Sequence, residues 1–355
     1  MDVLIIADDL TGALDTASQF GDRTYVLLDY DFRLRADYLA VSTDTRLVSP
    51  EKASLKVRRV LNAGFSFSYL YKKTDSTMRG NVGAELGEIS SSLDENIPFT
   101  PAFPEQGRIV VDGILYVQDK LLEETHYVKE LPIRSSNLVD MVRATTNVKV
   151  DYWGGNGDIL IFRDIRSRSD LSAAFDSLID RHHVMGGSAG LAIELSKYLG
   201  TMRPQKPEAG GPILIVSGSE NEVTRRQLRA ISEHLPVLSL DSLGLMRAKE
   251  MLRRKEDVAV SFSLSSVSRE ALSMVSSLLT KCPVGGLIVV GGETLRSLLN
   301  YLGVKAIKIG ESPEIGLAGG WIMGGALDGT PIVSKAGGFG SRDTLVNAWR
   351  WLKRS

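Results

Sequence analysis

Two adjacent carboxylates, Asp8 and Asp9, stand near the start of the chain, directly after the unbroken apolar run Val3–Ala7. Such a run, rich in β-branched residues, is typical of a strand buried on both faces of a parallel sheet. Ligands of these sheets bind beyond the carboxyl ends of the strands, where the two carboxylates are expected to lie. A carboxylate there could accept a proton from a hydroxyl group or orient it. In the alternative interpretation, Asp9 or Thr11 caps the following helix and Asp8 is merely solvated.

A second set of polar residues is concentrated in the loops of the first half of the chain. Arginine binds carboxylates through two parallel hydrogen bonds, and aspartate and asparagine suit sugar hydroxyls. A small hydroxylated acid would satisfy both kinds of group. Each residue taken singly is more often a member of a surface ion pair, so the hypothesis depends on their concentration. The candidates are Lys73, Asp75, Arg79, Asn81, Arg108 and Arg134.

Three glycine-bearing turns follow predicted strands in the second half. Glycine lets the backbone approach a polyanion, and the helix after each turn offers free N–H groups and a partial positive charge. The turns therefore favour a nucleotide phosphate site, although any glycine can simply end a strand. None of them has the spacing of a P-loop or of a Rossmann dinucleotide site. They are Ser217-Gly218-Ser219, Gly291-Gly292-Glu293-Thr294 and Gly337-Gly338-Phe339-Gly340.

Some residues near these turns have two interpretations. Glu293 could hold a ribose hydroxyl or a hydrated metal ion, or it could be a first-turn acid that the helix dipole favours. Lys335 could neutralise phosphate charge, or it could be a solvated lysine at a strand end. His182 and His183 have no second His/Cys cluster to accompany them, so zinc is not expected.

The elements that must position these residues alternate between strand and helix, which indicates parallel sheets with crossover helices. The dipeptide Asp112-Gly113 between apolar runs also predicts a β-hairpin. Strands are predicted at 3–7, 25–28, 38–42, 67–72, 159–162, 213–216, 258–264, 286–290 and 332–335, and helices over 50–61, 82–93, 170–180, 221–234 and 295–302.

The segment 201–212 carries three prolines and two glycines, which predicts a linker. We therefore predict a substrate-binding domain at 1–202, a linker at 203–212 and a nucleotide-binding domain at 213–355. The expected fold class is α/β, with two domains, each a mostly parallel sheet flanked by helices, and a cleft between them.

Composition limits the partners of this chain. A formal net charge of -1 gives no reason to expect a nucleic acid. No apolar stretch reaches the roughly 20 residues that a membrane span needs. The single cysteine, Cys282, excludes an intrachain disulfide and fits the reducing cytoplasm. The sequence leaves a homo-oligomer open.

Several of these motifs together resemble the four-carbon acid sugar kinases. They run in the order of that family across nearly the whole chain, which is shorter than the family pattern between Tyr116 and Arg134. The resemblance implies an N-terminal substrate domain, a C-terminal nucleotide domain, and ATP-dependent phosphorylation of the terminal hydroxyl of threonate, erythronate or 3-oxo-tetronate. The matching motifs are Ala7–Ala13, Lys73–Asn81, Pro101–Arg108, Arg134–Ser136, Gly187–Leu191, Val216–Ser219, Val223–Gln227, Gly291–Thr294 and Lys335–Gly340.

We therefore expect a kinase in which the glycine turns and Mg²⁺ hold the phosphates of ATP. Arg79 or Arg108 would pair with the carboxylate of the acid, and Asp75 and Asn81 would hold its hydroxyls. Asp8 or Asp9 would accept the proton of the attacking hydroxyl. The alternatives are a sensor that binds a sugar acid and a nucleotide without catalysis, and a sugar-acid phosphatase.

Overall fold

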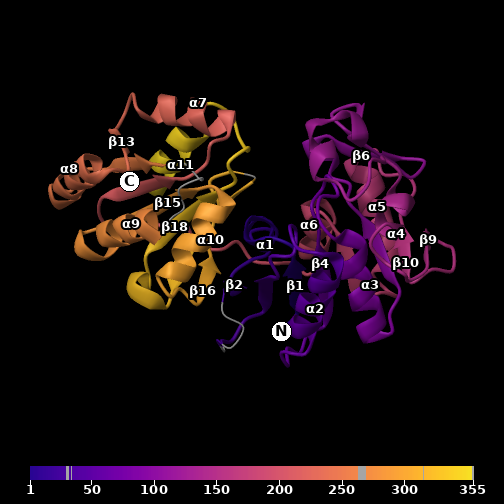
Figure 1. Ribbon diagram of the computed structural model, residues 1–355. Helices are drawn as coiled ribbons and strands as arrows, with labels where there is room; N and C mark the ends of the chain where they lie inside the picture. The colour runs from indigo at the N-terminus through magenta and orange to yellow at the C-terminus, as the bar shows by residue number, and fades with distance from the viewer. Residues whose placement is uncertain (29–31, 33, 263–268, 315, 354–355) are drawn as a thin grey trace. The chain divides into compact units, whose positions relative to one another are not determined.

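The computed structural model describes residues 1–28, 32, 34–262, 269–314 and 316–353 (Figure 1). The chain divides into two compact units, Met1–Thr24 with Leu34–Met202, and Tyr25–Arg33 with Arg203–Ser355. The segment from Tyr25 thus belongs to the second unit, whereas the sequence analysis counted it with the first. The reason is that β2 (Thr24–Leu27) pairs in antiparallel fashion with β16 (Ala306–Ile309), a strand from the far end of the chain.

The first unit contains a parallel sheet with the strand order β3-β1-β4-β11-β5-β10-β9. The strand β1, second in this order, is wholly buried, as the apolar run predicts. The chain passes from β1 to β3 on one side and then to β4 on the other, so β1 marks a topological switch point. The strands are β1 (Val3–Ala7), β3 (Tyr38–Ser42), β4 (Tyr69–Lys73), β5 (Ile97–Thr100), β9 (Val150–Tyr152), β10 (Ile159–Ile161) and β11 (Val184–Gly187).

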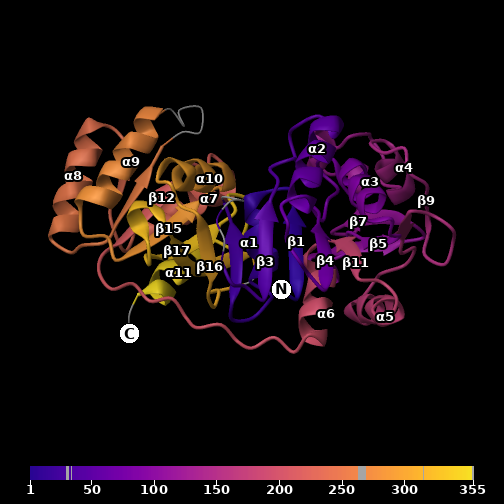
Figure 2. The ribbon, with the colours of Figure 1, turned by 90° about the horizontal axis from the view of Figure 1, so that it is seen from below.

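Helices cover both faces of this sheet (Figure 2). On one side α1 (Leu10–Ala17) and α5 (Arg168–Leu178) pack against α6 (Ala189–Tyr198). On the other side, α3 (Val82–Leu93) packs between α2 (Pro50–Leu61) and α4 (Leu138–Arg143). The apolar strands are therefore shielded on both faces, which is the condition for a parallel sheet.

A small antiparallel sheet is inserted between β5 and α4. It consists of β6 (Arg108–Val111), β7 (Ile114–Val117) and β8 (Lys120–Leu121). The predicted hairpin is confirmed, because Val111 pairs with Ile114 and both intervening residues have positive φ. Short 3₁₀ helices flank the sheet: η1 (Pro104–Gln106), η2 (Leu122–Glu124) and η3 (His126–Glu130).

The second unit has the strand order β13-β14-β12-β15-β18-β17-β16-β2. The strands from β13 to β18 in this order are parallel, and β17, β16 and β2 are added in antiparallel fashion. The bounds are β12 (Ile213–Ser217), β13 (Val237–Ser239), β14 (Val258–Ser261), β15 (Gly286–Val290), β17 (Leu317–Met323) and β18 (Pro331–Lys335).

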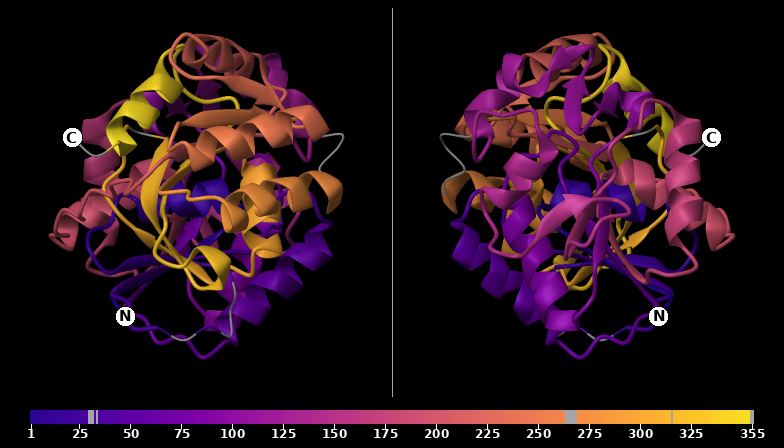
Figure 3. Two further views of the ribbon diagram at one scale, coloured as in Figure 1. Left: turned by 90° about the vertical axis from the view of Figure 1, so that its left-hand side faces the viewer. Right: turned by 90° about the vertical axis from the view of Figure 1, so that its right-hand side faces the viewer.

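The helices of the second unit, coloured from salmon to yellow in Figure 3, form two groups. The helix α7 (Glu222–Ile231) packs against α11 (Thr344–Leu352), and both contribute to a core with Ile213, Ile215 and Ile288. The helix α9 (Arg269–Lys281) packs against α8 (Ser242–Arg253) and α10 (Gly292–Tyr301). The 3₁₀ turn η5 (Gly325–Leu327) follows β17.

The predicted strands and helices are largely confirmed, and β1 and α3 have the predicted bounds. Residues 263 and 264 of the predicted strand 258–264 lie outside the described residues, and β14 ends at Ser261. The analysis missed the strands β5, β8, β9, β13, β16 and β17 and the helices α4, α8 and α9. The glycines in β17 made this segment resemble a loop in the sequence. The structure requires a glycine at Gly319, because a Cβ there would overlap the carbonyl of Glu311. No helix in the described part of the chain is long and apolar enough to cross a membrane.

Candidate functional site

In the first unit, the carboxyl ends of three neighbouring strands lie at one level of the sheet. Ala7 at the end of β1 pairs with Ser42 of β3 and with Lys73 of β4. The residues that follow these three strands must therefore leave the sheet side by side. This register brings the loop of Asp8 together with the loops that begin at Thr43 and Thr74.

Arg46, in the loop after β3, connects the carboxylates of this edge. Its Nε donates to Asp8 Oδ2 at 2.7 Å, and its Nη1 lies 2.9 Å from Asp9 Oδ2. Its Nη2 lies 3.7 Å from Asp75 Oδ1. The sequence analysis missed Arg46, although it follows β3 in the same way that Asp8 follows β1.

Asp8 and Asp9 have different roles in the structure. Asp9 is the N-cap of α1, where its Oδ1 accepts from the Gly12 amide at 2.8 Å and its Oδ2 accepts from Thr11. Asp8 is buried, and its Oδ1 has no hydrogen-bond partner among the described residues. Burial alone would raise the pKa of Asp8, but the charges of Arg46, Lys72 and Lys73 and the hydrogen bond from Arg46 together outweigh it, and the pKa is lowered. Asp8 is thus an ionised carboxylate with one free oxygen.

Asp75 and Arg79 form a bidentate pair at the end of β4. The Nε and Nη2 of Arg79 donate to the two carboxylate oxygens of Asp75 at 2.8 and 2.9 Å, and its Nη1 donates to Glu130 at 3.2 Å. Burial opposes ionisation of Asp75, but Arg46 and Arg79 hold its pKa well below the usual range. The Arg79 guanidinium also lies over the ring of Tyr127. Its three donor nitrogens are therefore already engaged.

The other predicted residues of this unit lie in different settings. Lys73 is buried, and a Cβ at Gly12 would lie 3.1 Å from its Nζ. Asn81 donates both amide hydrogens to the loop of Arg46, at the carbonyls of Thr45 and Val48, so it positions that loop. Arg108 bonds the carbonyl of Gln106, and its buried Nε has no partner among the described residues. Arg134 is exposed.

In the second unit, the three glycine turns meet at the carboxyl ends of β12, β15 and β18. A Cβ at Gly218 would overlap Thr294 Oγ1, and a Cβ at Gly337 would overlap Ser219 Oγ. A Cβ at Gly291 would lie 3.5 Å from Ser219 Cβ. Three segments that are far apart in the sequence therefore surround one small region of backbone.

Polar side chains on α7 hold the third turn in place. The Thr224 hydroxyl donates to the Gly337 carbonyl at 2.7 Å. The Gln227 amide donates to the carbonyls of Phe339 and Ser341 at 3.0 and 2.7 Å. The sequence analysis did not assign these contacts, because nothing in the sequence relates α7 to a turn that follows β18.

The helix α10 presents free donors at the same place. Gly291 is its N-cap with φ 107°, and no side chain caps the helix. The first amides of a helix have no partner within it, so they are available to an anion. The hydroxyl oxygens of Ser217 and Thr294 are buried without partners among the described residues. Glu293 and Gly338 are exposed, and Gly340 closes the third turn with φ 91°.

Lys335 at the end of β18 is buried beside this region. Its Nζ donates to the carbonyl of Ala336 at 2.6 Å, with Gly337 O at 3.3 Å. Burial lowers the pKa of Lys335 to about 8, partly opposed by the charge of Glu314. The lysine therefore carries a charge that is sensitive to pH near neutrality.

We expect Gly291→Ala to weaken nucleotide binding. At φ 107° an L-residue is strained, and the new Cβ would lie 3.2 Å from Thr294 Oγ1. Displacement of the first amides of α10 should raise the Kd for ATP at least about tenfold, measured by titration calorimetry. Gly210→Ala is the control, because no atom lies within 4 Å of its Cβ. Equal ATP affinity in both variants would refute the hypothesis that the first amides of α10 bind the phosphates.

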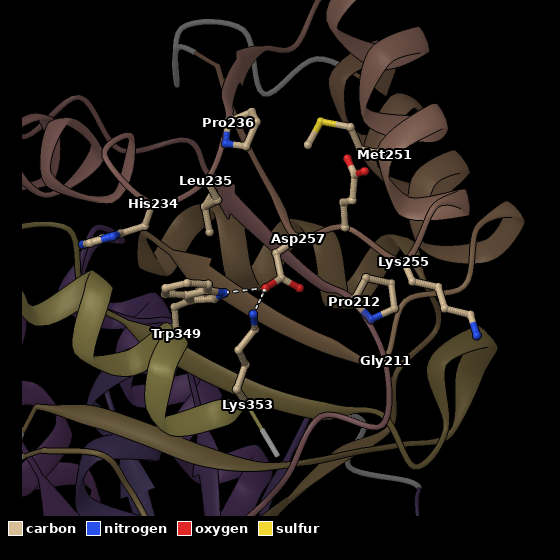
Figure 4. A pocket seen from close by; sticks show the side chains of 11 residues that line it. Gly211, Pro212, His234, Leu235, Pro236, Met251, Lys255, Asp257, Trp349 and Lys353 are labelled. Carbon is tan, nitrogen blue, oxygen red and sulfur yellow. Dashed lines mark hydrogen bonds and ion pairs between the residues drawn. The ribbon is translucent and has the colours of Figure 1, made fainter. Parts of the chain in front are cut away.

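A pocket of about 530 Å³ lies at the amino ends of strands β12, β13 and β14 in the second unit (Figure 4). Its wall is held by Asp257, which accepts from Trp349 Nε1 and from the Ile213 amide, both at 2.8 Å, and pairs with Lys353. Asp257 therefore ties the C-terminal helix to the start of β12. We interpret the pocket as structural.

The described residues contain no group of three His, Cys, Asp or Glu residues that could hold a metal ion. Mg²⁺ commonly keeps several waters and takes its other ligands from substrate phosphates, so it does not need such a group. The whole arrangement is that of an α/β enzyme with polar sites at the carboxyl ends of its strands.

Comparison with known proteins gives the family. Residues 3–184 match a family model described as a sugar-binding N-terminal domain, and residues 247–345 match a nucleotide-binding C-terminal domain. The first match covers more than half of the chain, and the chain belongs to the four-carbon acid sugar kinase family.

Two curated relatives are similar over their full length. The D-threonate kinase of Cupriavidus necator is 29% identical, with 100% of this chain and 99% of that protein covered. The D-threonate kinase of Salmonella typhimurium is 25% identical, with 99% of each covered. Other relatives are named D-erythronate kinase and 3-oxo-tetronate kinase.

A crystal structure of a Salmonella typhimurium protein shares the fold. It has a TM-score of 0.81 at 20% identity and covers 98% of this chain and 99% of that one.

Proposed function

We propose that this protein transfers the γ-phosphoryl group of ATP to the terminal hydroxyl of a four-carbon acid sugar. One observation supports the proposal most strongly: Asp8 is ionised and keeps one buried oxygen free, at the switch point of a sheet in a domain of the sugar-binding family. A carboxylate in this state can accept a proton.

Asp8 would act as the base in this reaction. The hydroxyl oxygen of the acid forms a bond to the γ-phosphorus, and the bond from that phosphorus to the β,γ-bridging oxygen breaks. ADP leaves with the electron pair, and the hydroxyl proton passes to Asp8. Phosphoryl transfer depends mainly on alignment and charge neutralisation, so the protein needs to supply little else.

The carboxylate of the substrate requires a cation with donors to spare. Arg79 is fully engaged with Asp75 and Glu130, which weakens its candidacy. Lys73 is buried close to Gly12, near the carboxyl end of β1 that Asp8 follows. Arg108 has a buried Nε without a partner among the described residues. We therefore propose Lys73 and Arg108 for the carboxylate, with the exposed Arg134 as a further candidate.

ATP would bind to the second unit, with its phosphates on the glycine turns and the first amides of α10. Mg²⁺, bound with the nucleotide, would neutralise part of the phosphate charge. Glu293 remains a candidate for the ribose or for a water on the metal. An ATP-dependent step in a chain with one cysteine fits the cytoplasm.

A direct assay distinguishes the candidate functions. The protein is incubated with Mg²⁺, ATP and each of D- and L-threonate, D- and L-erythronate and 3-oxo-tetronate, and both ADP and the phosphorylated acid are measured. We expect stoichiometric formation of both with at least one acid. Thermal stabilisation by acid and ATP without ADP would indicate a sensor. Phosphate release from a phosphorylated acid without nucleotide would indicate a phosphatase.

We expect the affinity for ATP to fall as pH rises through about 8, because Lys335 loses its charge there. The groups near its amine are Glu314 and the carbonyls of Ala336 and Gly337. The second phosphate ionisation lies near pH 6, so ATP itself changes little above about pH 7.5. Between about pH 7.5 and 9.5 the Kd should rise at least about threefold.

The variant Lys335→Met serves as the control for this pH effect. It should bind ATP more weakly at pH 7.5 and show a nearly flat Kd over the same range. A wild-type Kd that does not change with pH, or an equal change in Lys335→Met, would exclude Lys335 as the source.

A further inference from the structure

A lysine and a glutamate are completely buried behind the aspartates of the first unit. The side chains of Lys72 and Glu85 are 0% and 1% exposed, and Lys72 Nζ lies 2.6 Å from Glu85 Oε2. The sequence analysis identified neither residue. When two opposite charges are buried, the free energy lost with their hydration is about as large as the free energy gained from their attraction. A buried ion pair is therefore weak evidence that the pair stabilises the fold. A role other than stability therefore has to be considered.

Lys72 forms hydrogen bonds to the ends of both β1 and β4, the strands that lead to Asp8 and Asp75. Its Nζ donates to the carbonyl of Lys73 at 2.8 Å on its own strand, and to the carbonyl of Ile6 on β1 at 3.3 Å. Ile6 lies only two residues before Asp8. The third contact of the amine is Glu85, in the first turn of α3. The ammonium group thus lies inside the sheet edge from which Asp8 projects.

Asp8 and Glu85 share the charge of Lys72. Each carboxylate has one buried oxygen without a hydrogen-bond partner among the described residues, Asp8 Oδ1 and Glu85 Oε1. Burial raises the pKa of Glu85 and the charge of Asp8 raises it further, while Lys72 lowers it. The charged groups that act on Asp8 are Arg46 on the β3 loop, Lys72 and Lys73 on β4, and Glu85 on α3. Protonation of one carboxylate therefore favours ionisation of the other.

We propose that Lys72 and Glu85 are positioning residues for the acceptance of a proton by Asp8. Neither touches the substrate. While Asp8 is ionised, the charge of Lys72 is divided between two carboxylates. When Asp8 takes the proton of the hydroxyl, Lys72 and Glu85 become a neutral pair, and the repulsion between the two carboxylates disappears. The statement that the proton comes from a substrate hydroxyl rests on the proposed function, whereas the coupling between Asp8 and Glu85 does not.

Reciprocal coupling gives a test that needs no activity. Side-chain carboxyl carbons of glutamate are followed by NMR during a pH titration of the full chain, with Glu85 assigned from the Glu85→Gln variant. In Asp8→Asn the midpoint of Glu85 should fall by at least about 0.5 pH unit, because a neighbouring negative charge is gone. Glu88 is the internal control: it lies one turn further on α3 and pairs with Arg58, so its midpoint should not move.

A kinetic arm uses Glu85→Gln, which keeps the size of the side chain and removes its negative charge. The repulsion on Asp8 is then gone while Lys72 stays, so Asp8 ionises more easily and the acid limb of kcat/KM should shift downward by at least about 0.5 pH unit. Glu88→Gln should leave the limb in place. A pair with a purely structural role would lower activity without moving the limb.

The two arms separate the possible failures. If the Glu85 midpoint is the same in wild type and Asp8→Asn, the proposal is wrong, whatever the kinetic arm shows. An unmoved acid limb in folded Glu85→Gln would also overturn it. If wild type phosphorylates no acid sugar, the proposed function fails, and the NMR titration still tests the coupling.

Discussion

Asp8→Asn is expected to lower kcat for phosphorylation of the acid by about 10²- to 10⁴-fold, the usual contribution of a general base. Asparagine keeps the shape of the side chain but cannot accept the proton. The ATP affinity should change less than about twofold, since the nucleotide is proposed to bind the other unit. Turnover is measured from ADP release at saturating acid, and ATP binding from titration calorimetry.

Asp9→Asn provides the matched comparison on the neighbouring residue. Asp9 is committed to the Gly12 amide, Thr11 and Arg46. Asparagine caps a helix about as well as aspartate, so the variant should keep the cap of α1 and lose only the charge beside Arg46, and kcat should stay within about tenfold of wild type. If Asp9→Asn lost the larger factor and Asp8→Asn kept its turnover, the proton would have to go to Asp9.

Arg46→Ala is expected to produce the largest loss of stability, about 3–5 kcal/mol of the free energy of unfolding near neutral pH. The substitution leaves Asp8 and Asp75 buried without the cation that lies beside both. Urea denaturation monitored by circular dichroism measures the change. Arg163→Ala is the control in the same unit, because Arg163 and Asp112 are both exposed, and it should change stability by less than about 1 kcal/mol.

The pH dependence of this loss has a definite sign. In wild type the folded-state pKa of Asp75 is depressed, so its contribution is present above its unfolded pKa and is lost as pH falls through the folded value. Without Arg46 that contribution shrinks. The difference between wild type and Arg46→Ala should therefore be largest near pH 7 and smaller near about pH 4. A difference that stays constant with pH would mean that Arg46 acts through packing alone.

Local sequence patterns determined much of the architecture. The apolar run before Asp8 predicted a fully buried strand, and Asp112-Gly113 predicted a hairpin, because both signals are contained in a few consecutive residues. The strand β2 was predicted, but its place in the second unit was not, for the opposite reason. That place is defined by pairing with β16, and no local signal contains this partner.

The residues of the candidate site also fall into those that the sequence indicated and those that only the structure revealed. The sequence identified Asp8, Asp75 and the glycine turns, since polar groups and glycines at strand ends are visible in one dimension. Only the tertiary structure showed that Arg46 joins the aspartates and that Lys72 and Glu85 lie buried behind them. It also decided that Asp9 caps α1, which the sequence had left as an alternative. Hydrogen-bond partners depend on which strands are neighbours and in what register, and burial then decides which charges remain available for chemistry.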